Sequence, residues 1–362
     1  MLTRAPVRPS QTELHARLDQ RVQELIALNF DPRHGAPFWL RRQQRLGLDA
    51  RHCVRGIRDL PLLGNLDPSE LAACPLTELT PGALLHARPD WVVAQTGGTT
   101  GKPAWTAYST TEFHEAFVAP FAAAARHVGF PRGGAWLYAG PSGPHIIGRA
   151  AVELARVSGS PAPFMVDFDP RWARKLPEAS FARERYLAHV VEQALNVLET
   201  QSIEILFSTP PILAELARRL APTRRSEIRG VHYGGMRVSA HRLAELRQAF
   251  PAAVHLSGYG NTLFGCCLEL SDEPGRVPEY FPFGERLLFH RPAPGRDAEP
   301  RHGPPHVRFT RLDSTMLLVN VVERDVAELT DPPAGSPTGF VLPGVRDPRP
   351  ACTSRPIAGG LY

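Results

Sequence analysis

A glycine-rich stretch is the part of this 362-residue chain whose residue types best fit a chemical role. Residues 94–109 read AQTGGTTGKPAWTAYS, with the consecutive residues Thr96, Gly97, Gly98, Thr99, Thr100, Gly101 and Lys102 at the centre. Glycines let backbone N–H groups turn toward an anion, threonine hydroxyls add donors, and lysine adds a point charge. A Walker A loop would need glycine at Thr96 and serine or threonine at Pro103, so this is a different loop. The pattern predicts a phosphate-binding loop.

Short apolar runs on both sides of this loop indicate two strands. Residues 91–94 predict a strand that enters the loop and residues 105–108 one that leaves it, which together make a hairpin. Leucines and valines at helical spacing predict an amphipathic helix over 11–29, and an alanine-rich run predicts another over 111–128.

The region after residue 130 alternates between helix and strand patterns. Ser180 and Ser239 are suited to cap helices. The alternation predicts a parallel sheet covered by helices, with strands over 135–139, 203–207, 228–233 and 253–257. Ligands of such sheets bind beyond the carboxyl ends of the strands. Here these ends are residues 208–209, 234–236 and 258–260.

Composition excludes some classes of function. The formal net charge is +5, arginine supplies nearly all of the positive charge, and no run of five basic residues occurs, so nucleic-acid binding is not expected. No apolar stretch approaches the ~20 residues of a membrane span, and the N-terminus lacks an apolar signal core. Five cysteines without a CxxC pair favour reduced thiols in a cytoplasmic protein.

The string TGGTTGKP resembles the phosphate loop of the adenylate-forming superfamily, which includes acyl-CoA ligases, luciferase and peptide-synthetase adenylation domains. The SSGTTGKP of phenylacetate–CoA ligases is its nearest form. The resemblance implies an α/β fold, namely the large N-terminal portion of the adenylate-forming fold, with parallel helix-covered sheets and a distorted β-barrel subdomain. We expect a helical segment at 1–90, a phosphate-loop segment at 91–180, a βαβ subdomain at 181–270 and a β-rich segment at 271–362.

Two further segments resemble the adenine-contacting motifs of this superfamily. HYGGMRVS at 232–239 resembles the loop that lines adenine, through Gly234, Gly235 and Met236. GYGNT at 258–262 resembles the YGxTE motif, which implies that Tyr259 flanks adenine, with Gly260 and Asn261 at its edge and Thr262 at the α-phosphate. Leu263 stands where the family has a Mg²⁺-holding glutamate. Glu269 is a candidate substitute, and the metal ligands stay unassigned.

Later segments resemble the ribose site and the hinge. NVVERD at 320–325 resembles the YRTGD motif, so Asp325 would accept bonds from both ribose hydroxyls. Arg324 replaces a glycine of that motif. GVRD at 344–347 resembles the hinge, with Arg346 near ribose or phosphate. Only fifteen residues follow Asp347, so we expect the mobile C-terminal lid and its catalytic lysine to be absent. Lys102 would then stabilise more of the charge, and transfer to coenzyme A is not expected.

The acyl site is expected after the strand at 135–139. The stretch YAGPSGPHIIG at 138–148 corresponds to the acyl-lining segment of phenylacetate-type ligases. The residues expected to contact the substrate are Tyr138, Ala139, His145, Gly148, Ser257 and Gly258. His145 would contact the carboxylate or cap a helix, and Arg149 is a second candidate cation. Cys266 and Cys267 favour buried core over a metal site.

The reaction that follows is ATP-dependent adenylation of a carboxylic acid, expected to be aromatic, with ATP and Mg²⁺ as cofactors. The expected catalytic residues are Lys102, Thr99, Thr100 and Thr262. The organisation also resembles truncated adenylating proteins of phenazine antibiotic pathways, which implies a partner reductase or transferase, and we expect a homodimer. Two alternatives stay open: an acyl-protein synthetase that loads Cys352, and a nucleotide- or acid-binding protein that has lost catalysis.

Overall fold

The structure is a computed structural model that describes residues 8–98, 101–177, 179–236, 238–271, 273, 275–290 and 304–351. Thr99, Thr100, Arg237 and Cys352 lie outside the described residues. Contacts group the chain into two compact units. Unit 1 comprises Met1–Ala116 and Phe281–Pro348, and unit 2 comprises Phe117–Tyr280 and Arg349–Tyr362. The four-segment division expected from the sequence stays a prediction.

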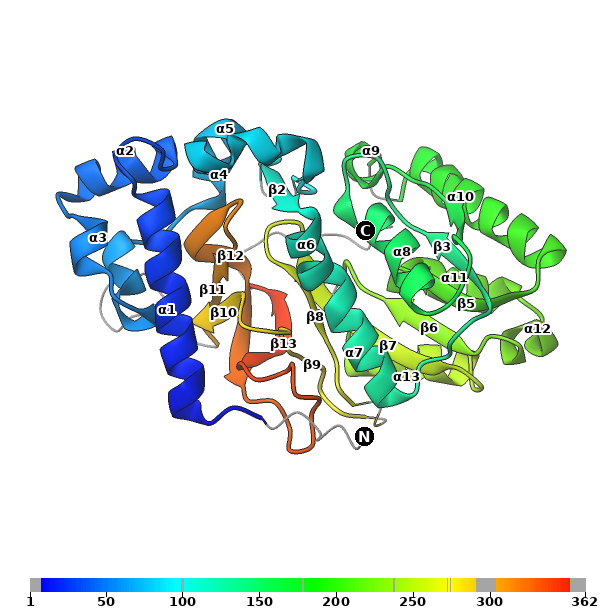
Figure 1. Cartoon of the computed structure of the whole chain (residues 1–362). Helices are drawn as coiled ribbons and strands as arrows, with labels where there is room; N and C mark the ends of the chain where they lie inside the picture. The colour runs from blue at the N-terminus through cyan, green and yellow to red at the C-terminus, as the bar shows by residue number, and fades with distance from the viewer. Residues whose placement is uncertain are drawn as a thin grey trace. The chain divides into compact units, whose positions relative to one another are not determined.

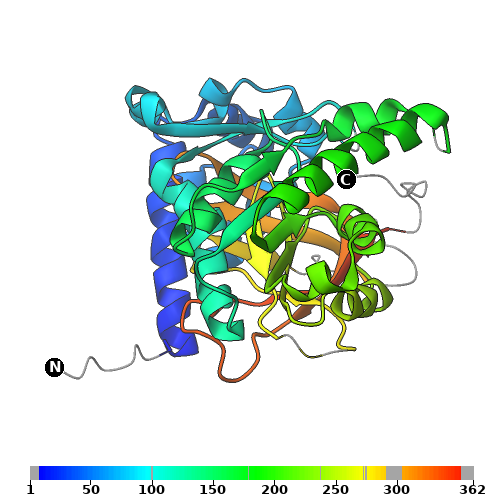
Figure 2. The ribbon, with the colours of Figure 1, turned by 90° about the vertical axis from the view of Figure 1, so that its right-hand side faces the viewer.

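Unit 1 begins with a series of helices. Helix α1 (Gln11–Asn29), blue in Figures 1 and 2, matches the predicted range; Ser10 and Glu13 form a capping box at its start. Residues 38–66 show no clear pattern in the sequence, because the helices there are short and two of the three end at glycines with positive φ, Gly47 at 63° and Gly64 at 70°. The helices that follow α1 in unit 1 are α2 (Pro37–Leu46), α3 (Ala50–Cys53), η1 (Ile57–Leu63), α4 (Pro68–Ala72), α5 (Leu76–Leu79) and η2 (Gly82–Asp90).

The predicted hairpin is present. Strands β1 (Trp91–Gln95) and β2 (Trp105–Ser109) pair antiparallel, from Trp91 opposite Ser109 to Gln95 opposite Trp105. The helix predicted over 111–128 is interrupted: α6 (Thr110–Phe113) is followed by a π turn at His114–Val118 and then by α7 (Ala119–Val128). Pro120 has no N–H to donate to the preceding turn, which accounts for the break.

In the main sheet of unit 1, β11 pairs antiparallel with both β10 and β12, and the sheet is irregular. Its order includes β10 (Leu287–His290), β11 (His306–Leu312), β12 (Leu317–Thr330) and β13 (Gly344–Pro350), coloured from gold to red in Figure 1. The pairing of β11 with β12 shifts twice. Within β12, Asn320 has a φ of 51°, and its amide nitrogen donates to the carbonyls of Leu60 and Gly64 at 2.9 and 3.2 Å. Asn320 thus ties η1 to the sheet.

A buried charge cluster fixes β2 to this sheet. Asp313 accepts bonds from Arg286 at 2.6 and 3.0 Å and from Arg311 at 2.6 Å. Arg311 also donates to the Thr106 hydroxyl at 2.8 Å and to the Ala107 carbonyl at 2.6 Å, both on β2. Burial alone would raise the pKa of Asp313, but the two guanidinium groups hold it below its ordinary value. The strand that leaves the glycine-rich loop is therefore anchored by a paired buried charge.

Unit 2 contains the predicted parallel sheet. Its strands follow the order β4 (Phe164–Val166), β3 (Ala135–Ala139), β5 (Ile203–Ser208), β6 (Gly230–Tyr233), β7 (Val254–Asn261), β8 (Gly265–Leu268). All pairs up to β7 are parallel, and β8 is antiparallel to β7. A last short strand, β9 (Glu279–Tyr280), ends the unit's main segment. The mixed α/β fold with a parallel sheet, expected from the sequence, is confirmed.

Helices cover both faces of this sheet. Leu206, Val231 and Tyr233 pack in one core with α10, α11 and α13, whereas Trp136 and His232 face α7 through ring contacts with Phe121. The long green helix α10 is prominent in Figures 1 and 2. The helices after α7 are α8 (Ile146–Val157), α9 (Pro170–Lys175), α10 (Phe181–Thr200), α11 (Pro210–Arg219), α12 (Pro222–Ser226) and α13 (Ala240–Ala249).

The connections reverse direction beside β3. Helix α8 links β3 to the edge strand β4, and α10 returns the chain past β3 to β5. Right-handed crossovers in opposite directions place these two helices on opposite faces. A crevice is therefore expected at the carboxyl ends of β3 and β5, where the direction changes.

We predict that Asp313→Asn destabilises unit 1 strongly. The substitution leaves two buried guanidinium groups without their counter-charge, so the free energy of unfolding should fall by about 3–5 kcal/mol. Urea unfolding followed by circular dichroism measures the change. Glu285→Gln is the control, because Glu285 pairs with Arg17 in an exposed salt bridge, worth about 0–1 kcal/mol. Equal effects of the two variants would contradict the role given to the cluster.

Candidate functional site

The glycine-rich loop of unit 1 is a hairpin closed at its base by Thr96. The Thr96 N–H donates to the Ala104 carbonyl, and the Ala104 N–H donates to the Thr96 hydroxyl, both at 2.9 Å. Gly98 has a φ of 64°, and a Cβ there would lie 2.7 Å from Pro103 Cγ, so the turn requires glycine. Lys102 is exposed at the end of the loop. Thr96 thus helps to close the hairpin, and Lys102 is available to a ligand from solvent.

The predicted ribose and hinge residues also lie in unit 1. Asp325 is partly buried on β12, and Arg324 Nε lies 3.6 Å from its Oδ1. The arginine that replaces the family's glycine therefore forms an ion pair with the predicted ribose acceptor. Arg346 is exposed on β13 and is followed by Asp347, whose φ of 47° is strained for a non-glycine residue. The predicted hinge segment is thus a strand with a local distortion.

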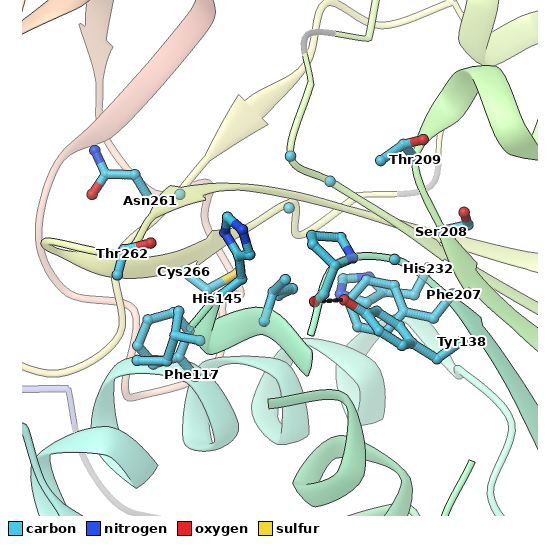
Figure 3. Close-up of a pocket in the computed structure, with 18 of the residues that line it drawn as sticks. Phe117, Tyr138, His145, Phe207, Ser208, Thr209, His232, Asn261, Thr262 and Cys266 are labelled. Carbon is cyan, nitrogen blue, oxygen red and sulfur yellow. Dashed lines mark hydrogen bonds between the residues drawn. The ribbon is translucent and has the colours of Figure 1, made fainter. Parts of the chain in front are cut away.

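A pocket of about 680 Å³, partly open to solvent, lies in unit 2 at the carboxyl ends of the parallel strands. This is the position expected from the reversal beside β3. The strand ends and connecting segments, the start of α8 and the β7–β8 hairpin form its walls (Figure 3). The lining residues are Phe117, Tyr138, Ala139, Gly140, Pro141, His145, Ile146, Ile147, Phe207, Ser208, Thr209, His232, Gly234, Gly235, Gly258, Gly260, Asn261, Thr262, Gly265 and Cys266.

The segment after β3 folds tightly over Tyr138. The Tyr138 hydroxyl donates to the Pro141 carbonyl at 2.8 Å, and a Cβ at Gly140 would lie 2.5 Å from the Tyr138 ring. A Cβ at Gly148 would lie 2.9 Å from Ser142 Cα, so this glycine lets α8 approach the segment. Tyr138 and Ala139 line the pocket as expected, whereas Gly148 is outside the lining and has a packing role.

His145 occupies the N-cap position of α8, yet its side chain makes no capping bond to that helix. The side chain is buried and lines the pocket instead. Burial, with the positive charge of Arg171 as the next contribution, lowers the pKa of His145, so the ring is neutral near pH 7. A neutral His145 can meet a carboxylate only as a hydrogen-bond donor. Arg149, the second candidate cation, is exposed and is not part of the lining.

The YGxTE-like segment lies within β7 and not after it. Gly258–Asn261 continue the strand and pair antiparallel with β8, which corrects the expected strand end near residue 257. The Asn261 amide oxygen accepts bonds from the N–H groups of Leu263 and Phe264 at 2.8 and 3.1 Å, so it closes the hairpin turn. Leu263 is buried in this turn. Gly234, Gly235, Gly258, Gly260, Asn261 and Thr262 all line the pocket.

Several predicted site residues of unit 2 lie outside the lining. The Ser257 hydroxyl bonds to the Tyr280 hydroxyl at 2.8 Å, and the Tyr259 ring packs 5.9 Å from that of Tyr280. Met236 and Glu269 do not line the pocket either. Their predicted roles stay predictions.

Five lining residues were not predicted as part of a site: Phe117, Phe207, His232, Gly265 and Cys266. Phe207 and His232 lie at or near strand ends, a position that could have suggested them. Cys267 is buried core, as predicted, but Cys266 faces the pocket. Burial raises the pKa of the Cys266 thiol to about 12.

The expected Mg²⁺ has no evident site in the part of the chain that the structure describes. Among the described residues, no three His, Cys, Asp or Glu side chains are grouped to hold a metal ion. Leu263 offers no oxygen at the position where the family has glutamate. The residues present do not fit a protein-held Mg²⁺. None of the described helices is long and apolar enough to span a membrane.

Comparison with solved structures identifies the fold. The structure is similar to 2-hydroxyisobutyryl-CoA ligase in an open conformation with 2-HIB-AMP and CoA, with a TM-score of 0.62, 15% identity and coverage of 94% of this chain and 70% of the ligase. The same ligase in the thioesterification state matches with a TM-score of 0.61 and 15% identity, over 93% of this chain and 68% of the ligase. MatB from Rhodopseudomonas palustris with ATP matches at a TM-score of 0.45 and 16% identity, over 70% of this chain and 47% of MatB.

No family model matches the sequence, and no curated protein matches it. The similarity to the first ligase therefore shows the fold: this chain has the architecture of the N-terminal part of an adenylate-forming ligase.

We predict that Cys266 resists alkylation although it lines a pocket. With a pKa of about 12, its thiolate fraction at pH 8 is far below that of an ordinary thiol, so iodoacetamide should react at least about a hundredfold more slowly than with the exposed Cys53. Peptide mass spectrometry over a time course measures both rates, and unfolded protein provides the reference. Equal rates in the folded protein would show that the thiol is not buried.

Proposed function

We propose that this chain catalyses the ATP-dependent adenylation of a carboxylic acid, with acyl-AMP and pyrophosphate as products. The main support is a pocket lined by uncharged residues at the carboxyl ends of the unit 2 strands. The fold that holds this pocket is similar to that of a ligase whose structure contains 2-HIB-AMP. The glycine-rich hairpin with the exposed Lys102 in unit 1 supports the same proposal.

The reaction needs positioning and charge stabilisation rather than an acid or base. A carboxylate oxygen of the acid attacks the α-phosphorus of ATP and forms a new oxygen–phosphorus bond. The bond between the α-phosphorus and the bridging oxygen to the β-phosphate breaks, so pyrophosphate leaves, and no proton is transferred. Lys102 and the loop N–H groups stabilise the charge that builds on the phosphates. Thr262 contacts the α-phosphate, and Asp325 accepts bonds from the ribose. Mg²⁺ is proposed only as the counter-ion of ATP, and no step is assigned to it.

An aromatic acid fits the pocket best. Phe117, Tyr138 and Phe207 contribute rings to its walls, and among the described residues no Lys, Arg, Asp or Glu lines it. Apolar, ring-rich walls favour a planar uncharged group beside the reacting carboxylate. Onward transfer to a reductase or transferase, a role in phenazine biosynthesis, a homodimer and a cytoplasmic location stay predictions.

A second candidate, a protein that binds nucleotide and acid without catalysis, is favoured by Leu263. This residue is 3% exposed and fixed in the turn by its bond to Asn261, at the position where a carboxylate is expected. Such a protein would bind AMP and release no pyrophosphate with any acid. The acyl-protein synthetase alternative depends on Cys352, which lies outside the described residues.

We predict that ATP shields Lys102 from acetylation. The chain contains only two lysines, Lys102 and Lys175, and both are exposed. A phosphate chain bound at the loop would neutralise and cover Lys102 alone, so its acetylation rate should fall at least about fivefold with ATP while that of Lys175 is unchanged. Mass spectrometry of the two peptides measures both rates. Equal protection, or none, would argue against phosphate binding at the loop.

We predict that Lys102→Ala lowers acid-dependent pyrophosphate release by about 10²–10³-fold, because a charge aimed at the phosphates in the transition state is lost. The assay measures pyrophosphate with a panel of aromatic and fatty acids. Lys175→Ala is the matched control and should retain wild-type activity. If Lys102→Ala is as active as wild type, the loop lysine has no catalytic role.

A further inference from the structure

Two hydroxyl groups of the unit 2 pocket are held as hydrogen-bond acceptors. The Tyr138 hydroxyl donates its proton to the Pro141 carbonyl, drawn as a dashed line in Figure 3, and the Ser208 hydroxyl donates its proton to the Ala139 carbonyl. A hydroxyl has one proton to donate. Any further bond between either group and a ligand must therefore be donated by the ligand.

His232, on the neighbouring strand β6, is held in the same way. Its Nδ1 lies 2.8 Å from the Leu256 carbonyl, which can only accept, so Nδ1 carries the proton of the neutral ring. Burial lowers the pKa of His232 to about 4, against the weaker opposing effect of the Leu256 bond. The imidazole is therefore neutral near pH 7, and Nε2 presents a lone pair.

Among the described residues, the bond of Nδ1 to Leu256 is the hydrogen bond that the His232 side chain makes, so Nε2 is not bonded to a described protein group, although His232 is only 3% exposed. The neighbouring groups are the rings of Phe121 and Phe207, at centroid distances of 5.0 and 4.3 Å, and neither offers an N–H or O–H donor. An acceptor that faces a mostly closed pocket gains stability when a ligand donates a hydrogen bond to it. His232 lines the pocket beside Phe207 and Tyr138 (Figure 3), so a ligand in the pocket can supply the missing donor.

The glycine at position 258 keeps space beside this imidazole. A Cβ there would lie 3.6 Å from His232 Cε1 and 3.2 Å from Cys266 Sγ. A side chain larger than that of alanine at position 258 would extend into the space beside the His232 ring, next to Cε1 and Nε2. Cys266 is a neutral thiol, so the space has no charged neighbour in the pocket lining.

We propose that the acid bound in this pocket has an uncharged ring that carries an N–H or O–H donor, and that this donor bonds to Nε2 of His232. The inference rests on the proposed function, since it takes the pocket to be the acid site. A ring that carries only acceptors would oppose lone pairs on His232, Ser208 and Tyr138. A second carboxylate would find no cation in the lining. Hydroxy- and amino-substituted aromatic acids have the required chemistry.

Titration calorimetry with matched acids tests the proposal. Wild-type protein is titrated with hydroxybenzoic acids and with methoxybenzoic acids of the same ring position, and with aminobenzoic acids and their dimethylamino analogues. At one ring position or more, the donor-bearing acid should bind at least about tenfold more tightly, because a site built around a buried acceptor rejects the analogue without a donor.

Two histidine variants locate the donor's partner. His232→Phe keeps a planar ring but removes the acceptor, so the preference for the donor-bearing acid should disappear. His255→Phe is the matched control: His255 is equally buried, lies on the adjacent strand β7 and does not line the pocket, so its variant should keep the preference. If His232→Phe fails to fold, wild-type protein with ¹⁵N-histidine gives the same answer, because the Nε2 resonance should shift with the hydroxy acid and not with the methoxy acid.

Distinct results would overturn the proposal. Wild-type protein that binds acids without a donor preference, a folded His232→Phe variant that keeps the preference, or an Nε2 resonance that does not respond would each refute the role of His232 while leaving the adenylation proposal intact. Loss of AMP binding by His232→Phe, with the acid preference unchanged, would assign Nε2 to the adenine amino group instead. Wild-type protein that binds no acid and releases no acid-dependent pyrophosphate would refute the proposed function and this inference together.

Discussion

The position of the glycine-rich loop depends on one buried carboxylate, Asp313. It lies between Arg286 and Arg311, and Arg311 continues to Thr106 and Ala107 on β2. A two-stranded hairpin such as β1–β2 is only marginally stable alone, so this attachment gives the loop a rigid base. Rigidity matters to the chemistry, because N–H groups stabilise phosphate charge well only when their orientation is fixed before the reaction. The hairpin and the charge cluster are therefore one structural assembly, and the proposed phosphate contacts would depend on both.

In unit 2 the backbone determines what the pocket can recognise. Tyr, Ser and His side chains can each donate or accept, so their identity alone does not define a ligand. Carbonyls of Pro141, Ala139 and Leu256 take the available protons and leave acceptors. These carbonyls belong to the strands and to the segment after β3, so the same sheet that builds the crevice also sets its polarity. Selectivity for donor-bearing acids would follow from the fold itself.

The sequence predicted most of the regular elements, because helix and strand periodicities are local. The ranges of α1 and β3 match the prediction, and the hairpin around Lys102 follows from short apolar runs beside glycines. Nonlocal contacts explain the differences. Gly258 and Gly260 suggest a turn, yet they belong to β7, where glycine is needed because a Cβ at Gly260 would lie 2.1 Å from the Gly265 carbonyl. The role of His232 could not be predicted, since its proton position depends on Leu256 of a neighbouring strand.

The continuity of β7 has a thermodynamic consequence. One uninterrupted strand runs from the parallel sheet through Gly258 and Gly260 in the pocket wall to the Asn261 turn. A ligand that orders the pocket wall would therefore also order the turn. By linkage, a change that loosens the turn would weaken ligand binding by the same free energy. Amide hydrogen exchange at Leu263 and Phe264, whose N–H groups bond to Asn261, would report occupancy of a cavity that neither amide touches.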